Sequence, residues 1–320
     1  MSVIFIFIDG LGLGSQEESN PFFVNDTPFF TEILEGSHLS SEAAEREYRQ
    51  VSLLGLDATL GVDGLPQSAT GQTTLFTGIN AAKIMGRHLR AFPNRRLRKI
   101  LSEKGMFLQL QKRSLNGTFV NSYRPEFFAS LSSEVKRSFS CSTLINYYAG
   151  LQFRTLDDLK TGNAINMDIT NESLREKGFD VPLVSPEEAG KRLVHISRGY
   201  DLTLYEYFMT DIAGHSGDPA MAAEVVKKLD KFLGSVVENI NPERELLLLT
   251  SDHGNIEDMS VRVHTINPVP ALIIGKDRCK LVNFLKAKRD ISGVFPAVLK
   301  VLAERKPVQV LPDDCSIGKL

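Results

Sequence analysis

The sequence predicts an α/β fold in which a mostly parallel sheet is flanked by helices and carries a smaller inserted cap domain. Three observations predict this fold: short apolar runs bounded by glycine or polar residues, a helical apolar pattern between two of these runs, and a central stretch of different composition. Short runs that are apolar throughout are typical of strands buried on both faces of a parallel sheet.

Four runs are the expected strands: Val3–Ile8, Leu202–Met209, Leu246–Leu249 with the following Thr-Ser, and Ala271–Ile274. Between the second and third runs, residues 221–233 place apolar side chains at helical spacing, which supplies the crossover that parallel strands require. Another helix is expected over residues 186–196, after a proline-containing hinge at 182–186.

The chain predicts a discontinuous core, residues 1–82 and 186–320, interrupted by a cap at residues 83–185. The first expected strand belongs with strands that return only after about residue 200, whereas the stretch between them is rich in Asn, Ser, Tyr and Arg. We therefore expect the core to bind metal and the cap to contact substrate.

Bulk composition predicts a cytoplasmic enzyme. The 320 residues are 42% hydrophobic and 24% charged, and the net charge of −2 argues against a nucleic-acid partner. Cys141, Cys279 and Cys315 lie far apart and are odd in number, which favours reduced thiols. The opening apolar run ends at Asp9 and is too short to be a signal peptide or membrane span, so no membrane partner is expected.

Carboxylates and imidazoles lie beside these expected strands. The candidate ligands are Asp9, Asp211, His215, Asp252, His253 and His264. In open α/β sheets ligands bind beyond the carboxyl ends of the strands, so these side chains are expected to converge. One such aspartate alone is usually a turn or N-cap residue, and one histidine alone is usually a satisfied core residue. Together they are enough to hold two divalent metals about 3.5–4 Å apart.

A second motif runs from Leu65 to Gly78 and contains Ser68 at the predicted start of a helix. Free backbone N–H groups and the positive end of the helix dipole make such a start an anion site. A metal on the Ser68 hydroxyl would lower its pKa and make it a nucleophile. The alternative is that Ser68 only caps the helix, which is what most serines at this position do.

The ordered set of motifs resembles the alkaline phosphatase superfamily, and within it the metalloenzyme branch of cofactor-independent phosphoglycerate mutase and phosphopentomutase. The resemblance rests on Asp9-Gly-Leu-Gly, Ser68-Ala-Thr-Gly followed by Gly78, Asp211-Ile-Ala-Gly-His215, Asp252-His253-Gly-Asn, and His264-Thr-Ile-Asn-Pro-Val-Pro. It covers the core, about two-thirds of the chain, and implies an alkaline-phosphatase-like sheet.

The resemblance also implies roles for individual residues. One metal would be held by Asp9, Ser68, Asp252 and His253. The other would be held by Asp211, His215 and His264, and Ser68 would carry the transferred phosphoryl group. Oxygen and imidazole ligands without thiolate suit Mn²⁺ or Zn²⁺, with Mg²⁺ as a further candidate.

We expect a phosphomonoester hydrolase that acts through a phosphoserine on a small phosphorylated metabolite. The alternative is a phosphomutase, because both reactions share the first half. Ala69 and Gln72 stand where the phosphoglycerate mutases have Glu and His, and the cap is small, which favours hydrolysis. A sulfate or phosphonate ester hydrolase is a further alternative, although the Ser68 segment lacks a sulfatase context. A metal-binding protein without catalysis is the last.

Arginines at the entrance of the cap are candidate substrate contacts. These are Arg87, Arg90, Arg95 and Arg96. The planar guanidinium fork binds phosphate or carboxylate through two parallel hydrogen bonds, which suits a grip on the distal anion of a substrate. The alternative for any one of them is a solvated basic helix face.

Overall fold

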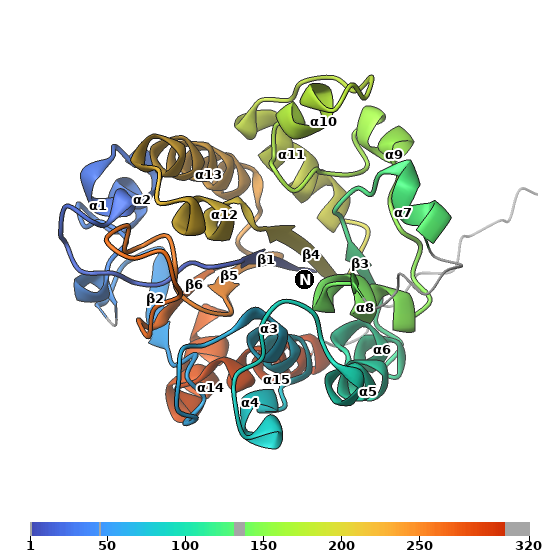
Figure 1. The fold of residues 1–320 in the computed structure, drawn as a ribbon, viewed down its shortest axis with the longest axis horizontal. Coiled ribbons are helices and arrows are strands. Elements are labelled where there is room, and N and C mark those ends of the chain that lie inside the picture. The colour runs from blue at the N-terminus through green and yellow to red at the C-terminus, as the bar shows by residue number, and fades with distance from the viewer. Residues whose placement is uncertain (1, 45, 131–137, 305–320) are drawn as a thin grey trace, which may run out of the picture.

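The computed structural model describes residues 2–44, 46–130 and 138–304, which form a sheet between two helical layers (Figure 1). The sheet has six strands in the order β2-β6-β5-β1-β4-β3. Their bounds are β1 Ser2–Ile8, β2 Val51–Leu56, β3 Gly117–Phe119, β4 Leu202–Tyr207, β5 Glu245–Ser251 and β6 Val269–Ile274. The predicted α/β class is confirmed, and each expected apolar run is a strand over most of its length.

Strand direction departs from the prediction at one place. β1 pairs in parallel with β4 and β5, and β3 pairs in parallel with β4. β6 runs antiparallel to both β5 and β2. The apolar run of β6 was predicted to be one more parallel strand. Because β6 instead runs in the opposite direction, the residues before it lie at the edge where β1, β4 and β5 end. His264, which precedes β6, therefore lies at the same edge as Asp9 and Asp252.

Alternate residues of β1 supply the cores of the two helical layers. Ile4, Ile6 and Ile8 pack in one cluster, whereas Val3, Phe5 and Phe7 pack in the other. The first face is covered by α1 (Pro21–Val24), α2 (Pro28–Ile33), α11 (Pro186–Ser197), α12 (Met209–Ser216) and α13 (Pro219–Asn239) (Figure 1). The second is covered by α3 (Ser68–Thr77), α4 (Ala81–Met85), α5 (Arg95–Lys104), α6 (Met106–Gln111), α8 (Cys141–Tyr148), α14 (Arg278–Lys288) and α15 (Val294–Ala303).

The segment 83–185, expected to be a cap, has two parts. Its β3 belongs to the main sheet, and residues of α5, α6 and α8 pack in the same cluster as Phe5 and Phe7. The outer part holds α9 (Leu156–Lys160) and α10 (Glu172–Glu176), with a small apolar cluster of its own, whereas Phe127 of α7 (Pro125–Ser130) packs against the main cluster. The boundaries of a separate cap stay a prediction, and the outer part is where we propose it.

The predicted helices begin where the local sequence favours a start. α3 begins at Ser68 and ends before Gly78, whose φ of 73° is left-handed and accessible to glycine. α11 begins with Pro186 after the Ser185 cap, whose side chain accepts the backbone N–H of Glu188. Apart from α13, the remaining helices were not predicted, among them α12, which begins shortly after β4, and η3 (Ile291–Gly293), which precedes α15.

The thiols and helices of the described residues bear on two further expectations. Cys141 is buried and Cys279 is exposed, and both are free; Cys315 lies outside the described residues. Within residues 2–44, 46–130 and 138–304, every helix is too short or too polar to cross a bilayer.

Candidate metal centre

The carboxyl edge of the sheet brings together the six aspartates and histidines that the sequence singled out. Asp9 follows β1, and Asp252 with His253 follows β5. Asp211 and His215 lie in the first and last turns of α12, four residues apart and therefore on one face of that helix. The loop before β6 completes the cluster with His264, because β6 runs in the opposite direction.

One half of the cluster lies around the ring of His253, which is fully buried. Its Nε2 is 3.3 Å from Asp9 Oδ1 and 3.5 Å from Asp252 Oδ2. The hydroxyl of Ser68 lies 3.1 Å from the same Nε2. Four side chains from three segments thus direct oxygen and nitrogen atoms at one point.

The other half lies around Asp211. Its Oδ1 is 3.5 Å from Nε2 of His215 and 3.5 Å from Nε2 of His264. The two Nε2 atoms are 3.2 Å apart. The ring of His264 stacks on that of His253 with centroids 3.7 Å apart, so the halves are adjacent. A ring nitrogen of His253 also lies within 4.8 Å of the ligand atoms of Asp211 and His264.

Backbone groups orient the two outer imidazoles. His264 Nδ1 lies 2.8 Å from the carbonyl of Pro66, and His215 Nδ1 lies 3.1 Å from the carbonyl of Arg262. A carbonyl only accepts, so each Nδ1 donates and each Nε2 is left with a free lone pair. This second hydrogen bond is the usual way in which a protein fixes the tautomer of a metal-binding histidine.

Amide side chains orient two of the carboxylates in the same way. Gln72 donates its amide to Asp9 Oδ2 at 3.1 Å, and Asn255 donates to Asp211 Oδ1 at 2.7 Å. Gly10 makes the close approach of β1 to α12 possible: its φ is 71°, and a Cβ there would lie 2.8 Å from Asp211 Oδ1.

The protein groups leave acceptor atoms of this cluster unsatisfied. Asp9 Oδ1 and both carboxylate oxygens of Asp252 are buried without a hydrogen-bond partner among the described residues. Buried carboxylates are costly unless they are paired or coordinate a metal. Two groups meet the requirement that all ligand atoms lie within 4.8 Å, Asp9 with Asp252 and His253, and Asp211 with His253 and His264. The donor set and its orphaned oxygens therefore fit divalent cations.

The pKa shifts of these groups also indicate that the cluster lacks positive charge. Burial, and next the charges of Asp252 and Asp211, raise the pKa of Asp9 well above its usual value. Burial and the charge of Asp211 raise the pKa of Asp252 to about 8. Burial, followed by the charge of His264, lowers the pKa of His253 to about 3. The inner carboxyls repel one another beside a neutral imidazole, and bound cations would remove that repulsion.

Ser68 does not behave as a helix cap. Gln67 occupies the N-cap position of α3, and no side-chain hydrogen bond caps the helix. The Ser68 hydroxyl instead contacts His253 at the centre of the cluster. The capping alternative for this serine is thus not what the structure shows, and the positive end of α3 points into the cluster.

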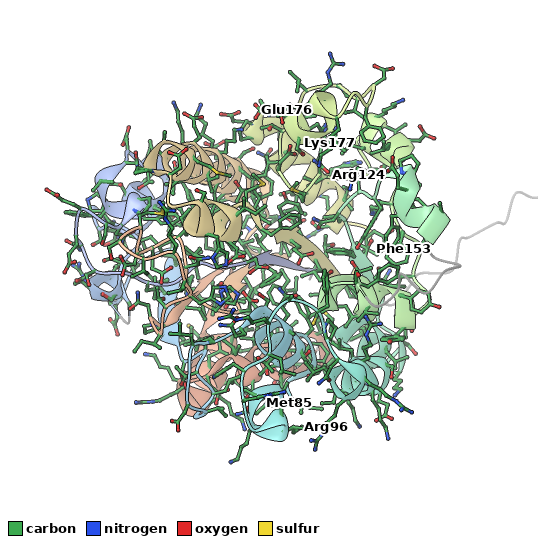
Figure 2. All side chains as sticks on the ribbon, viewed as in Figure 1. Met85, Arg96, Arg124, Phe153, Glu176 and Lys177 are labelled. Carbon is green, nitrogen blue, oxygen red and sulfur yellow. The ribbon has the colours of Figure 1, made fainter. Side chains whose placement is uncertain are left out.

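A pocket of about 430 Å³ opens on the metal centre. Ser68, Asp211, His215 and His264 line it, together with two arginines, Arg90 and Arg262. Of the four cap arginines, only Arg90 is among the described residues that line this pocket. Arg95 and Arg96 begin α5 and are exposed, and Arg87 is exposed as well. Figure 2 shows Arg96 at the outer margin of the molecule.

Three residues of the site were not identified from the sequence. Asn255 lies within the Asp-His-Gly-Asn motif, so its place there was a usable signal, although its contact with Asp211 was not inferred. Arg262 and Glu257 lie in the loops beyond that motif, where nothing in the local pattern distinguishes them from surface residues.

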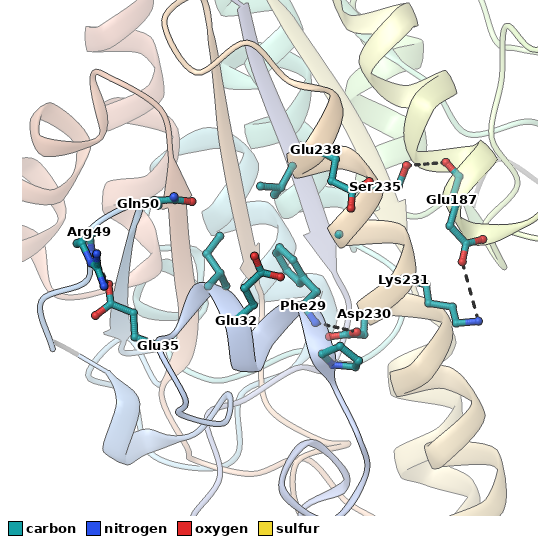
Figure 3. Close-up of a pocket in the computed structure, with 14 residues that line it drawn as sticks. Phe29, Glu32, Glu35, Arg49, Gln50, Glu187, Asp230, Lys231, Ser235 and Glu238 are labelled. Carbon is teal, nitrogen blue, oxygen red and sulfur yellow. Dashed lines mark hydrogen bonds and ion pairs between the residues drawn. The ribbon is translucent and has the colours of Figure 1, made fainter.

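A larger hollow of about 550 Å³ lies elsewhere, between α2 and α13, and we refer to it as the α2–α13 groove (Figure 3). Its carboxylates include Glu35, Glu187 and Asp230. Asp230 accepts the backbone N–H groups of Phe29 and Phe30 at 3.2 and 3.1 Å, which caps α2. The hydrogen bonds of Asp230 therefore stabilise the fold.

A family model described as the Metalloenzyme superfamily matches residues 1–303, almost the whole chain. The chain belongs to the Metalloenzyme superfamily. This membership confirms the expectation of a metal-dependent enzyme and, with the six-stranded sheet, the resemblance to the alkaline phosphatase superfamily.

Curated relatives carry the name 2,3-bisphosphoglycerate-independent phosphoglycerate mutase. The one from Thermococcus gammatolerans is 31% identical over 128 residues, which is 37% of this chain and 30% of the relative. Another, from Desulforudis audaxviator, is 31% identical over 135 residues, or 40% of this chain and 26% of the relative. The matched segment thus spans about a third or less of the relatives' length.

Solved structures share the fold. The PH0037 protein from Pyrococcus horikoshii is 16% identical, covers 86% of this chain and 85% of its own, and superposes with a TM-score of 0.52. The alkaline phosphatase of the Antarctic bacterium TAB5 is 14% identical over 95% of this chain and 99% of its own, with a TM-score of 0.47. At these identities the first likeness concerns the fold alone.

Proposed function

We propose that this chain is a two-metal phosphoryl-transfer enzyme that acts on a small phosphorylated metabolite through a phosphoserine at Ser68. The observation that carries the proposal is the position of the Ser68 hydroxyl, 3.1 Å from His253 Nε2 at the start of α3 and in the lining of the metal-centre pocket. The proposal is supported by a candidate nucleophile, a helix start and a convergent set of candidate ligands at one place.

The ligand assignment follows the two halves of the cluster. Asp9, Ser68, Asp252 and His253 would hold one cation, and Asp211, His215 and His264 the other. The oxygen and imidazole donors favour Mn²⁺ or Zn²⁺, with Mg²⁺ possible. When bound, two such cations supply the charge that neutralises a phosphoryl group and lowers the pKa of a bound hydroxyl.

The residues of this chain then carry out the transfer. Ser68 Oγ attacks phosphorus in line, the new Oγ–P bond forms, and the ester P–O bond breaks. Ser68 loses its hydroxyl proton, and the departing alcohol takes up a proton. The positive end of α3 stabilises the charge on the phosphoryl oxygens throughout.

The fate of the phosphoserine separates two enzyme classes. The sequence alone favoured hydrolysis, in which water removes the phosphoryl group. The relatives named phosphoglycerate mutase support the alternative better, in which a hydroxyl of the retained alcohol takes it back. We therefore propose the phosphomutase type first and the phosphatase second. Gln72, which stands where the phosphoglycerate enzymes have a histidine, donates to Asp9, so its part is in orienting that ligand.

Arg90 and Arg262 are the proposed contacts for the distal part of the substrate. Both line the pocket that holds Ser68, and both are exposed. A guanidinium at the pocket mouth would pair with a second anionic group of the substrate through two hydrogen bonds. Arg87, Arg95 and Arg96 lie outside the described lining, and their role as substrate contacts rests on the sequence alone.

The deciding experiment is to incubate the Mn²⁺-loaded protein with a panel of phosphorylated metabolites that includes 3-phosphoglycerate and ribose 1-phosphate. Isomer and free phosphate are followed in parallel, with an aryl phosphate and metal-free protein as controls. Isomerisation without phosphate release supports the mutase, and release of phosphate supports the phosphatase. Metal binding without turnover of any compound contradicts both.

A further inference from the structure

Glu257 is a buried carboxylate that joins three loops of the metal centre. Its side chain is 1% exposed in a loop beyond β5. Oε2 accepts the backbone N–H of Gly12 at 2.8 Å and that of Asn255 at 2.7 Å. Oε1 accepts the hydroxyl of Thr265 and the side-chain amide of Asn267, the latter at 3.1 Å. Four donors therefore converge on one carboxylate.

Each of these donors belongs to a segment that carries a proposed metal ligand. Gly12 lies three residues after Asp9, Asn255 lies two residues after His253, and Thr265 directly follows His264. One loop follows β1, and the other two segments lie between β5 and β6, more than two hundred residues later in the chain. A displacement of Glu257 would thus be transmitted to ligands of both proposed metals.

Two motif glycines are explained by the position of this carboxylate. A Cβ on Gly12 would lie 2.2 Å from Glu257 Oε1, and a Cβ on Gly254 would also lie 2.2 Å from that oxygen. A side chain at either position would displace the carboxylate from its present place. The second glycine of Asp-Gly-Leu-Gly and the glycine of Asp-His-Gly-Asn therefore leave room for a carboxylate that is in neither motif.

Hydrogen bonds, and not an opposite charge, compensate the burial of Glu257. Among the described residues no lysine or arginine forms an ion pair with it, and both oxygens are occupied by donors from the polypeptide. Hydrogen bonds to a carboxylate are about twice as strong as those between neutral groups, so this arrangement is stable and sharply directional. It leaves Glu257 unable to bind a metal itself.

We propose that Glu257 is a positioning residue that holds the ligand loops in the geometry of the two-metal site. The inference rests on the proposed function, because it assigns to Glu257 an effect on metal affinity. Loss of an outer-shell partner of a metal ligand weakens metal binding by about 10–100-fold. Glu257 acts on three loops at once, so we expect a loss within this range even for its most conservative replacement.

The test compares Glu257→Gln with wild type and with a matched control, Glu245→Gln. Glu245 is also buried, accepts the backbone N–H of Asn241 and pairs with Arg198, but it begins β5 at the end far from Asp252. Thermal unfolding and the Mn²⁺ dissociation constant are measured for each full-length protein. Glutamine keeps a carbonyl oxygen that accepts the two backbone N–H groups. Its NH₂ group would face the NH₂ group of Asn267, so the hydrogen bond between these side chains is lost.

The expected result is a Mn²⁺ dissociation constant at least about tenfold higher for Glu257→Gln than for Glu245→Gln, at comparable losses of thermal stability. Glu257→Ala should be worse than Glu257→Gln. Equal Mn²⁺ affinities in the two glutamine variants would overturn the inference. If neither Glu257 variant folds, Thr265→Val removes one donor to Glu257; a raised Mn²⁺ dissociation constant then supports the inference, and an unchanged one overturns it. Failure of the wild type to bind Mn²⁺ would instead contradict the proposed function.

Discussion

Two regions of this molecule gather carboxylates, and they differ in what satisfies them. In the α2–α13 groove, Asp230 caps α2, Glu35 pairs with Arg49 at 3.4 Å, and Glu187 pairs with Lys231 at 3.9 Å (Figure 3). In the metal centre, Asp9 Oδ1 and both oxygens of Asp252 are buried without a hydrogen-bond partner among the described residues. The groove is the larger hollow, about 550 Å³ against about 430 Å³ for the metal-centre pocket.

This difference teaches that unsatisfied chemistry identifies the site better than hollow volume does. A carboxylate that caps a helix or pairs with lysine is compensated by groups of the protein and does not need a ligand. A buried carboxylate without a hydrogen-bond partner lowers stability, so its presence points to a compensating ligand. The predictions below compare matched substitutions in the two regions.

The largest effect is expected from Ser68→Ala beside Ser235→Ala in the α2–α13 groove. Ser68→Ala should lower kcat by on the order of 10⁴–10⁶-fold, as removal of a covalent nucleophile does. Ser235 donates to the carbonyl of Glu187 at 2.7 Å, so its loss should affect unfolding by only about 1 kcal/mol and leave turnover unchanged. Turnover is measured on the best substrate of the panel. Activity kept by Ser68→Ala but lost by Thr73→Ala would mean that the nucleophile is misassigned.

The second effect compares Asp252→Asn with Asp230→Asn. Asp252→Asn should weaken metal binding by more than about 100-fold, beyond the range for outer-shell changes. It should also raise the unfolding temperature of the metal-free protein, because it removes a buried carboxyl that repels its neighbours. Asp230→Asn should leave metal affinity unchanged and lower stability by about 1 kcal/mol through its helix-capping bonds. Calorimetric metal titration and thermal unfolding measure both; equal metal affinities would remove the distinction between the regions.

Metal should stabilise the fold more strongly at alkaline than at acid pH. The pKa of Asp252 is raised to about 8, so the metal-free fold loses stability as pH rises through that value and this carboxyl ionises. Cations bind the ionised carboxylate. A free metal concentration of 100 times the dissociation constant raises the free energy of unfolding by about 2.7 kcal/mol. Thermal shifts with Mn²⁺ should therefore be larger at a pH of about 8.5 than at about 5.5. A shift that is independent of pH would contradict the role of Asp252.

The smallest effect is expected at the pocket mouth. Arg90→Ala and Arg262→Ala should each raise KM for a substrate with a second anionic group by about tenfold, as loss of one charged hydrogen-bond pair does. An aryl phosphate without that group should be turned over as before. Arg95→Ala and Arg96→Ala on α5 are the matched controls and should change neither value. Equal KM values in all four variants would mean that Arg90 and Arg262 do not contact the substrate.

Much of the site was predictable because its ligands lie at the ends of recognisable elements. Asp9 ends an apolar run, Asp252 and His253 follow another, and Ser68 begins a helix, so local pattern placed each of them. The start of α3 at Ser68 and that of α11 at Pro186 were predicted for the same reason. The strand β3 was not, because three residues within a polar stretch carry too little periodicity to indicate a strand.

The sequence by itself determined which residue types gather at the candidate metal centre, since strand ends, helix starts and glycine-bearing turns are set by local side-chain and backbone preferences. Only the tertiary structure decided how they meet. The reversal of β6 brings His264 to the others, Glu257 joins three loops, and Arg262 enters the pocket in place of most of the cap arginines. Each of these depends on hydrogen bonds and packing between segments far apart in the chain, which no local pattern encodes.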